Sequence, residues 1–280
     1  MIAILLGLAA GCSWGVSDFL GGFKSRDMPV LTVLVVSQPI GLVLAGAAVA
    51  VHHVAPPSWE FLAAGFAGGV ANVIGLAAFY RSMAIGKISI VAPVAAMSPT
   101  LPVLAGLLVG ERPSGWRTLG MAAAVIGVVL ISMRFGDDAT PPSRAALPLA
   151  AVAAVAFGLT FIFVHRASQG DVLWGILLQR IGMVTLVALW SAAARNWPTA
   201  LSKGALPVLV AIGILDVSGT TLFGLASVIG MVGLSAVLAS LHPVTTIIVA
   251  RIVAYERLNR YQLAGIGVTL LGIVVISANG

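Results

Sequence analysis

The sequence predicts an all-α integral membrane protein in which ten transmembrane helices form two inverted five-helix repeats around a central cavity. Composition, ten apolar segments and an internal duplication support this fold class. Hydrophobic residues make up 60% of the chain and charged residues 9%, and the mean hydropathy is +1.10. A chain of this composition has too few polar side chains to cover a water-soluble globule. Its long apolar runs favour helices, because a membrane barrel would show alternating strands of about ten residues.

The apolar residues gather into segments of the length that a membrane-spanning helix requires, which is about 20 residues. The 32 glycines suit close packing of such helices. Almost no sequence is left over for a domain outside the membrane. The ten predicted spans are 2–20, 29–51, 60–82, 88–109, 116–133, 147–165, 171–193, 205–226, 231–252 and 260–278.

The two halves of the chain are copies of each other. Residues recur 144 positions later in one stretch, where Gly69, Val73, Gly75, Phe79, Ile85, Gly86, Ala95 and Pro99 match Gly213, Val217, Gly219, Phe223, Ile229, Gly230, Ala239 and Pro243. In the next stretch, 145 positions later, Glu111, Arg112, Gly120, Gly127, Ile131 and Ser132 match Glu256, Arg257, Gly265, Gly272, Ile276 and Ser277.

An odd number of spans in each copy turns the second copy upside down in the bilayer. Such inverted repeats are typical of carriers that work by alternating access. We therefore divide the chain into a first repeat over 1–134, a polar linker over 135–146 and a second repeat over 147–280. The linker reads as a tether that lets one half rock against the other.

Positive charge is distributed unevenly between the two sets of connections. Three basic residues, Arg112, Arg117 and Arg166, belong to one side. The other side has Lys24, Arg26, Arg81, Lys87, Arg134, Arg144, Arg195, Lys203, Arg251, Arg257 and Arg260. The positive-inside rule then predicts that both termini are extracytoplasmic. Basic anchors at helix ends are compatible with the same topology, and the net charge of +6 gives no case for nucleic acid.

Four ionisable residues, Asp18, Arg180, Asp216 and His242, are singled out as lying away from the ends of the predicted spans, where each needs a partner or a function. At 1.5 Å per residue, the last three lie about 14 to 17 Å from the start of their spans, close to the bilayer midplane. Asp18 is nearer the basic residues at the end of its span, Lys24 and Arg26. An interfacial ion pair with these residues is the simplest expectation for Asp18.

Asp216 occupies the position in the second repeat that Asn72 occupies in the first. Pseudo-symmetry predicts that both side chains face one central axis and line the cavity. The alternative is a hydrogen-bonded pair that only holds the two helices together. Glycines three residues further on and phenylalanines seven residues further on share this helix face: Gly75, Gly219, Phe79 and Phe223.

Arg180 is an asymmetric addition, because Gln179-Arg180 repeats Gln38-Pro39 of the first half. A lone arginine at the midplane is costly, so the sequence predicts an ion pair with Asp216 or with an anionic group of a substrate. An internal salt bridge without a role in transport is the alternative.

Prolines fall at matching places in the fourth and ninth spans, in Ser98-Pro99 and His242-Pro243. A proline inside a helix removes a hydrogen bond and bends the helix. We predict hinges at Pro93, Pro99, Pro102 and Pro243, with static bends as the alternative. His242 can titrate near neutral pH, so Asp216 and His242 are the candidate proton-coupling residues. A neutral histidine bonded to a backbone carbonyl is the alternative for His242.

These features together resemble the drug/metabolite transporter superfamily, and within it the ten-helix EamA-like carriers. The resemblance rests on the two-times-five arrangement, Trp14-Gly15 echoed by Phe157-Gly158, the prolines, and Gly110-Glu111-Arg112 echoed by Tyr255-Glu256-Arg257. It implies a cavity lined by spans one, three, four, six, eight and nine. On this sequence it nominates Trp14, Ser17, Asn72, Phe79, Tyr80, Met97, Ser98, Phe157, Thr160, Asp216, Thr220, Phe223 and His242, to which the charge argument adds Arg180.

We therefore expect a secondary active transporter in a bacterial inner membrane that exports small amphipathic metabolites, with amino acids as the best candidates. The alternatives are a drug, sugar or nucleotide-sugar carrier of the same fold, or a lipid-carrier flippase. The chain contains no nucleotide-binding motif, metal motif or catalytic constellation, so an enzyme is not expected. The expected partners are a small-molecule substrate, membrane lipids and protons as candidate coupling ion, with no cofactor and a monomeric state.

Overall fold

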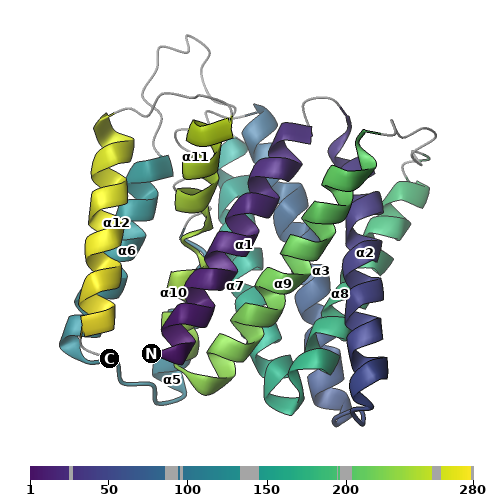
Figure 1. The fold of residues 1–280 in the computed structure, drawn as a ribbon, viewed down its shortest axis with the longest axis horizontal. Coiled ribbons are helices and arrows are strands. Elements are labelled where there is room, and N and C mark those ends of the chain that lie inside the picture. Colours follow the sequence, from purple (N-terminus) through teal and green to yellow (C-terminus); the bar gives the residue numbers. More distant parts are fainter. Residues whose placement is uncertain are drawn as a thin grey trace.

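A computed structural model describes residues 1–24, 28–85, 94, 97–132, 145–193, 195, 204–253 and 260–278. Every regular element in these ranges is an α-helix, and no strand occurs in them. The helices run side by side as one bundle, and the two termini lie at the same end of it (Figure 1). The elements are α1 (Ile2–Lys24), α2 (Val30–His52), α3 (Trp59–Ile85), α5 (Thr100–Leu108), α6 (Gly115–Ser132), α7 (Ala146–Gly170), α8 (Val172–Ala193), α9 (Leu206–Ile229), α10 (Val232–Ala239), α11 (His242–Val253) and α12 (Arg260–Ala278).

Six helices are long and apolar enough to cross a membrane, namely α1, α2, α3, α7, α8 and α9. Shorter apolar helices occupy Gly115–Leu130, Val232–Thr246 and Leu263–Ile276, where the fifth, ninth and tenth spans were expected. Most of the first half of the fourth expected span, and nearly all of the polar linker, fall outside the described residues. The protein is thus an all-helical membrane protein, and the count of ten spans stays a prediction.

The ninth span is broken, whereas the sequence predicted one continuous kinked helix over 231–252. α10 ends at Ala239, a turn follows at Ser240 and Leu241, and α11 begins at His242. Proline fits the first turn of a helix, where its missing N–H has no intrahelical acceptor in any case. The sequence His242-Pro243 therefore begins a new helix instead of bending an existing one.

In the fourth span, too, a helix begins directly after a turn. Residues 97–99 form a turn, Pro99 caps α5, and Pro102 lies in the first turn of that helix. Pro99 and Pro102 therefore lie at the start of a helix and not in its middle. Their role as hinges stays a prediction. Pro93 and the side chain of Pro243 lie outside the part of the chain that the structure describes.

Helices from different repeats pack in matching pairs. α1 packs on α9 as α3 packs on α7, α2 packs on α9 as α3 packs on α8, and α6 packs on α12. The breaks rest on matched glycines of α1 and α7. A Cβ added to Gly15 would lie 2.6 Å from the His242 carbonyl oxygen, and one added to Gly158 would lie 2.8 Å from that of Ser98. Such approaches are possible only without a side chain.

The contact between α6 and α12 is also built on repeated glycines. A Cβ on Gly120 would lie 2.8 Å from the carbonyl oxygen of Gly272, and one on Gly272 would lie 2.6 Å from that of Gly120. A Cβ on Gly127 would lie 2.8 Å from the Gly265 carbonyl oxygen. The resulting helix pair forms one edge of the bundle (Figure 1).

The start of α10 is capped by a carboxylate from the other repeat. Glu111, just after α5, accepts hydrogen bonds from the backbone N–H groups of Val232 and Gly233, the latter at 3.3 Å. The first N–H groups of a helix lack intrahelical acceptors, and its dipole favours negative charge there. Glu111 of the first repeat therefore holds the start of α10 in the second repeat.

Candidate functional site

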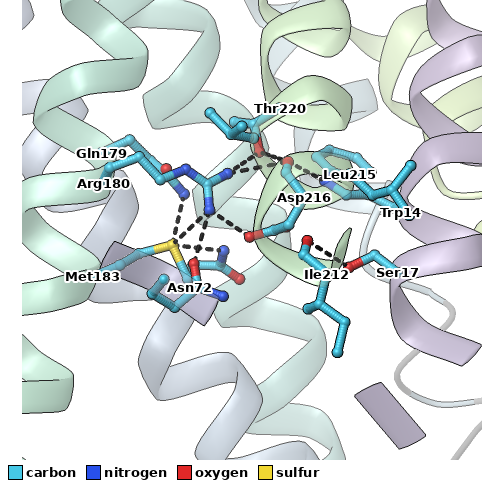
Figure 2. A network of polar contacts seen from close by, with 12 residues as sticks. Trp14, Ser17, Asn72, Gln179, Arg180, Met183, Ile212, Leu215, Asp216 and Thr220 are labelled. Atoms are coloured by element: carbon cyan, nitrogen blue, oxygen red, sulfur yellow. Dashed lines mark hydrogen bonds and ion pairs between the residues drawn. The ribbon is translucent and has the colours of Figure 1, made fainter. Parts of the chain in front are cut away.

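Arg180 is the centre of a polar network inside the bundle (Figure 2). Its side chain is 0% exposed, and its guanidinium forms an ion pair with the Asp216 carboxylate. It also donates to Gln38 Oε1 at 2.9 Å, to Thr220 Oγ1 at 2.5 Å and to the Asp216 carbonyl oxygen at 3.1 Å. The ion pair that the sequence predicted is present, joining α8 to α9, and α2 completes the cage. A buried charge persists only with such partners.

Asp216 is less enclosed than its partner, since its side chain is 18% exposed. Its backbone carbonyl accepts from Trp14 Nε1 at 3.3 Å and from Thr220 Oγ1 at 2.9 Å, besides the guanidinium. Two serines of α1 donate to neighbouring carbonyls of α9, Ser13 to Leu215 at 2.7 Å and Ser17 to Ile212 at 3.3 Å. These bonds hold α1 against the segment of α9 that carries the charge.

Asn72 joins the same network from α3, so the two symmetry-matched positions do converge. Asn72 Nδ2 lies 3.5 Å from the Met183 sulfur, which also receives Gln179 Nε2 at 3.2 Å and Arg180 Nη1 at 3.6 Å. Met183 was not among the predicted site residues, because an apolar side chain in an apolar helix gives no signal in the sequence.

Aromatic side chains border the network in a pseudo-symmetric way. The Trp14 ring lies against Gly219, where an added Cβ would come within 2.7 Å of it. The Phe157 ring lies against Gly75, and an added Cβ there would also come within 2.7 Å of the ring. Phe79 meets Phe157 edge-on with ring centroids 6.2 Å apart. On the predicted face, Gly75 and Phe79 of the first repeat therefore contact Phe157 of the second repeat, and Gly219 of the second repeat contacts Trp14 of the first.

Phe223 belongs to an aromatic cluster rather than to an open wall, since it is only 1% exposed. Its ring centroid lies 4.9 Å from that of Phe161 and 6.1 Å from that of Trp14, and the centroids of Trp14 and Phe161 are 5.9 Å apart. Phe161 was missed by the sequence analysis. Its place one turn after Phe157 on the same helix is the signal that could have found it.

A second charged group lies at the break between α10 and α11. His242 Nδ1 and Asp18 Oδ2 are 2.7 Å apart, with side chains 36% and 46% exposed respectively. Asp18 thus has a partner from the other repeat that the sequence analysis did not expect. Arg26, one of its two expected partners, lies outside the described residues. The break places the imidazole beside α1, a tertiary contact that sequence distance does not reveal.

Other predicted site residues belong to α7 and to the turn before α5. Thr160 donates to its own helix at Ala156 (2.9 Å) and toward the Gly68 carbonyl of α3 at 3.5 Å. Ser98 is buried and Met97 is exposed in the turn before α5. The side chain of Tyr80 lies outside the part of the chain that the structure describes. Within the described ranges, no group of three histidine, cysteine or acidic residues could hold a metal ion.

Matched helix pairs, together with a polar network in which Arg180 of the second half bonds to Gln38 of the first, define a helical membrane protein made of two repeats. The sequence profile of the EamA-like transporter family matches residues 1–133 and again residues 144–278. The chain belongs to this family of membrane transporters.

Comparison with solved structures shows the same fold in a chain described only as "Crystal structure of protein". The TM-score is 0.79 at 19% sequence identity, and the alignment covers 99% of this chain and 96% of that one. A comparison with curated proteins finds no match.

Proposed function

We propose that this transporter is a secondary active exporter of amino acids or amino-acid-like compounds and works by alternating access. The observation that carries the proposal is the Arg180–Asp216 pair, in which a fully enclosed cation meets a partly exposed anion. A zwitterion offers the complementary charges, with its carboxylate directed to Arg180 and its ammonium group to Asp216. Exchange of one ion pair for two keeps every charge compensated in the low-dielectric interior.

The aromatic side chains beside this pair support a substrate with an apolar part. Trp14 bonds to the Asp216 carbonyl and at the same time contacts the rings of Phe161 and Phe223. Its indole therefore borders both the charged network and the apolar cluster. Binding sites for small molecules commonly combine apolar walls with a few polar groups that fix orientation.

For energy coupling we propose protons, bound at the Asp18–His242 pair. Asp216 and His242 were both predicted as coupling residues, but the Asp216 carboxylate is held by a buried arginine. His242 faces a carboxylate at a half-exposed position next to a helix break. Histidine changes charge in the physiological pH range, and a charge change at the break would alter how α11 is held against α1.

Thermal stabilisation of the purified protein tests the substrate class, because a ligand that binds only the folded state raises its apparent stability. We expect amino acids with apolar side chains to raise the melting temperature more than sugars, cationic drugs or polyprenyl phosphates. Counterflow in proteoliposomes loaded with the best ligand then tests transport. Stabilisation by polyprenyl phosphates alone would contradict the proposal and favour a lipid-carrier flippase.

A further inference from the structure

Met183 lies at a point where hydrogen-bond donors outnumber good acceptors. Three donors surround its sulfur, Arg180 Nη1, Gln179 Nε2 and Asn72 Nδ2, at 3.6, 3.2 and 3.5 Å. We call these three groups the donor cluster; Figure 2 shows them converging on the sulfur from two helices. A thioether is only a weak acceptor, so the two amide donors are used poorly. Arg180 Nη1 also donates to Gln38 Oε1 at 2.9 Å and to the Asp216 carboxylate, so it brings mainly its positive charge to the sulfur.

Two further polar atoms around Met183 are buried without a hydrogen-bond partner among the described residues. They are Gln179 Oε1 and Arg180 Nε, and both side chains are 0% exposed. Buried polar groups in folded proteins are nearly always satisfied, and exceptions call for a functional explanation or a missing group. Of the two atoms, Arg180 Nε is a donor and suits an additional acceptor, whereas Gln179 Oε1 is itself an acceptor and suits a donor.

Space for such an acceptor exists if Met183 moves. A recess between α2 and α8 is lined by Leu34, Val35, Gln38, Pro39, Val184, Val187 and Ala188. Leu34 and Val187 also pack with Met183 in one apolar cluster, so the recess adjoins the side chain. Methionine has three rotatable bonds and adapts to irregular space more readily than a branched side chain.

We propose that the Met183 thioether is a placeholder for the substrate carboxylate. It occupies the donor cluster when the site is empty and turns toward the recess when a carboxylate arrives. The inference rests on the proposed function for the zwitterionic substrate, but it concerns carboxylates as a chemical class. A carboxylate accepts several hydrogen bonds at once, and bonds to a guanidinium are stronger than those between neutral groups.

Substitution of the placeholder tests this directly. Met183→Ala removes the sulfur and the work of moving it, so isocaproate, which has the leucine side chain and carboxylate without the ammonium group, should bind more tightly by about threefold or more. Isoamylamine, which lacks the carboxylate, should bind Met183→Ala and wild-type protein equally. Unchanged or weaker isocaproate binding by Met183→Ala overturns the proposal.

Filling the recess provides a second, independent variant that leaves every polar group in place. Ala188→Leu occupies the space that Met183 needs, so it should weaken isocaproate binding in the wild-type background. The same change should have little effect in the Met183→Ala background, because no side chain then has to move. Additive effects of the two substitutions would show that Ala188→Leu acts in another way and would overturn the placeholder.

L-leucine separates this inference from the proposed function. Isocaproate that binds as described while L-leucine fails to bind leaves the placeholder standing and refutes the amino-acid substrate. L-leucine that binds through Arg180 but is indifferent to Met183→Ala and Ala188→Leu leaves the amino-acid substrate standing and refutes the placeholder. Absence of isocaproate binding to Met183→Ala protein refutes the placeholder as well.

Discussion

The two repeats carry the same residues where helices touch and different residues where the polar network forms. Glycines at contact points recur in both, as at Gly69 and Gly213 or Gly75 and Gly219. Three of the four ionisable residues singled out in the spans belong to the second copy: Arg180, Asp216 and His242 stand where the first repeat has Pro39, Asn72 and Ser98. Close backbone approach has a steric requirement that applies to both copies alike. A buried charge needs partners only where it lies, so the charged network does not have to be repeated in the other half.

This difference shows that one set of residues holds the helices together and another set forms the polar network. The symmetric residues hold α1 on α9 and α3 on α7. The asymmetric ones join helices of different repeats, with Gln38 bonded to Arg180 and Asp18 to His242. A conformational change of one repeat against the other would strain these cross-repeat bonds first.

The largest effect is expected at the matched pair Asp216 and Asn72. Asp216→Asn leaves the enclosed Arg180 without its anion, and we expect a loss of roughly 3–5 kcal/mol in the free energy of unfolding. Asn72→Leu removes only a contact with sulfur and should cost about 1 kcal/mol or less. Denaturant or thermal unfolding in detergent measures both. Equal losses of unfolding free energy in the two variants would show that Asn72 and Asp216 contribute equally to stability.

The scaffold glycines should respond alike in the two repeats. A Cβ at Gly69 would lie 2.7 Å from the Met183 backbone nitrogen, and one at Gly213 would lie 2.9 Å from the Ile40 Cβ. Alanine at either position should destabilise the fold by about 1–3 kcal/mol through overpacking. The control is Gly267→Ala in α12, where nothing lies within 4 Å of the new Cβ. Melting temperatures that fall at one glycine only would contradict the symmetric scaffold.

Glu111 should contribute to stability through the cap of α10. Glu111→Gln keeps most of the side chain but removes the charge that faces the first N–H groups, so we expect a loss of about 1 kcal/mol. Arg112→Gln, at the exposed neighbouring position, serves as the matched control. Thermal unfolding of both variants measures their stability. A larger loss of stability in Arg112→Gln than in Glu111→Gln would contradict the role of Glu111 as the cap of α10.

The smallest effect on stability is expected at His242, because its pair with Asp18 is half exposed and such pairs are worth about 0–1 kcal/mol. The effect on coupling should be clear nevertheless. His242→Asn should abolish accumulation driven by a pH gradient while counterflow of substrate continues. The control is Ser98→Asn at the matched position. Accumulation at normal rates in His242→Asn proteoliposomes would remove His242 from the coupling mechanism.

The duplication made much of the helix arrangement predictable from the sequence. Apolar segments marked the helices, and Asp216 with Asn72 marked the helix faces that meet at the network. The break at Ser240 and Leu241 was not predicted, because a proline predicts either a kink or a new helix start and the choice depends on packing against Gly15. Met183 and Phe161 were missed because apolar residues among apolar residues give no contrast. The contact of Asp18 with His242 was not predicted, because it depends on how the two repeats pack together.

The central claim, that Arg180 serves the substrate as well as the fold, is tested most directly by amino-acid transport in the double variant Arg180→Met with Asp216→Asn. Removal of both charges leaves no stranded ion, so stability should recover relative to either single variant. The account predicts that transport stays below wild type by more than about 10-fold, because the carboxylate has lost its buried cation. Recovery of wild-type amino-acid transport in the stable double variant would contradict the account and leave Arg180 as part of the scaffold alone.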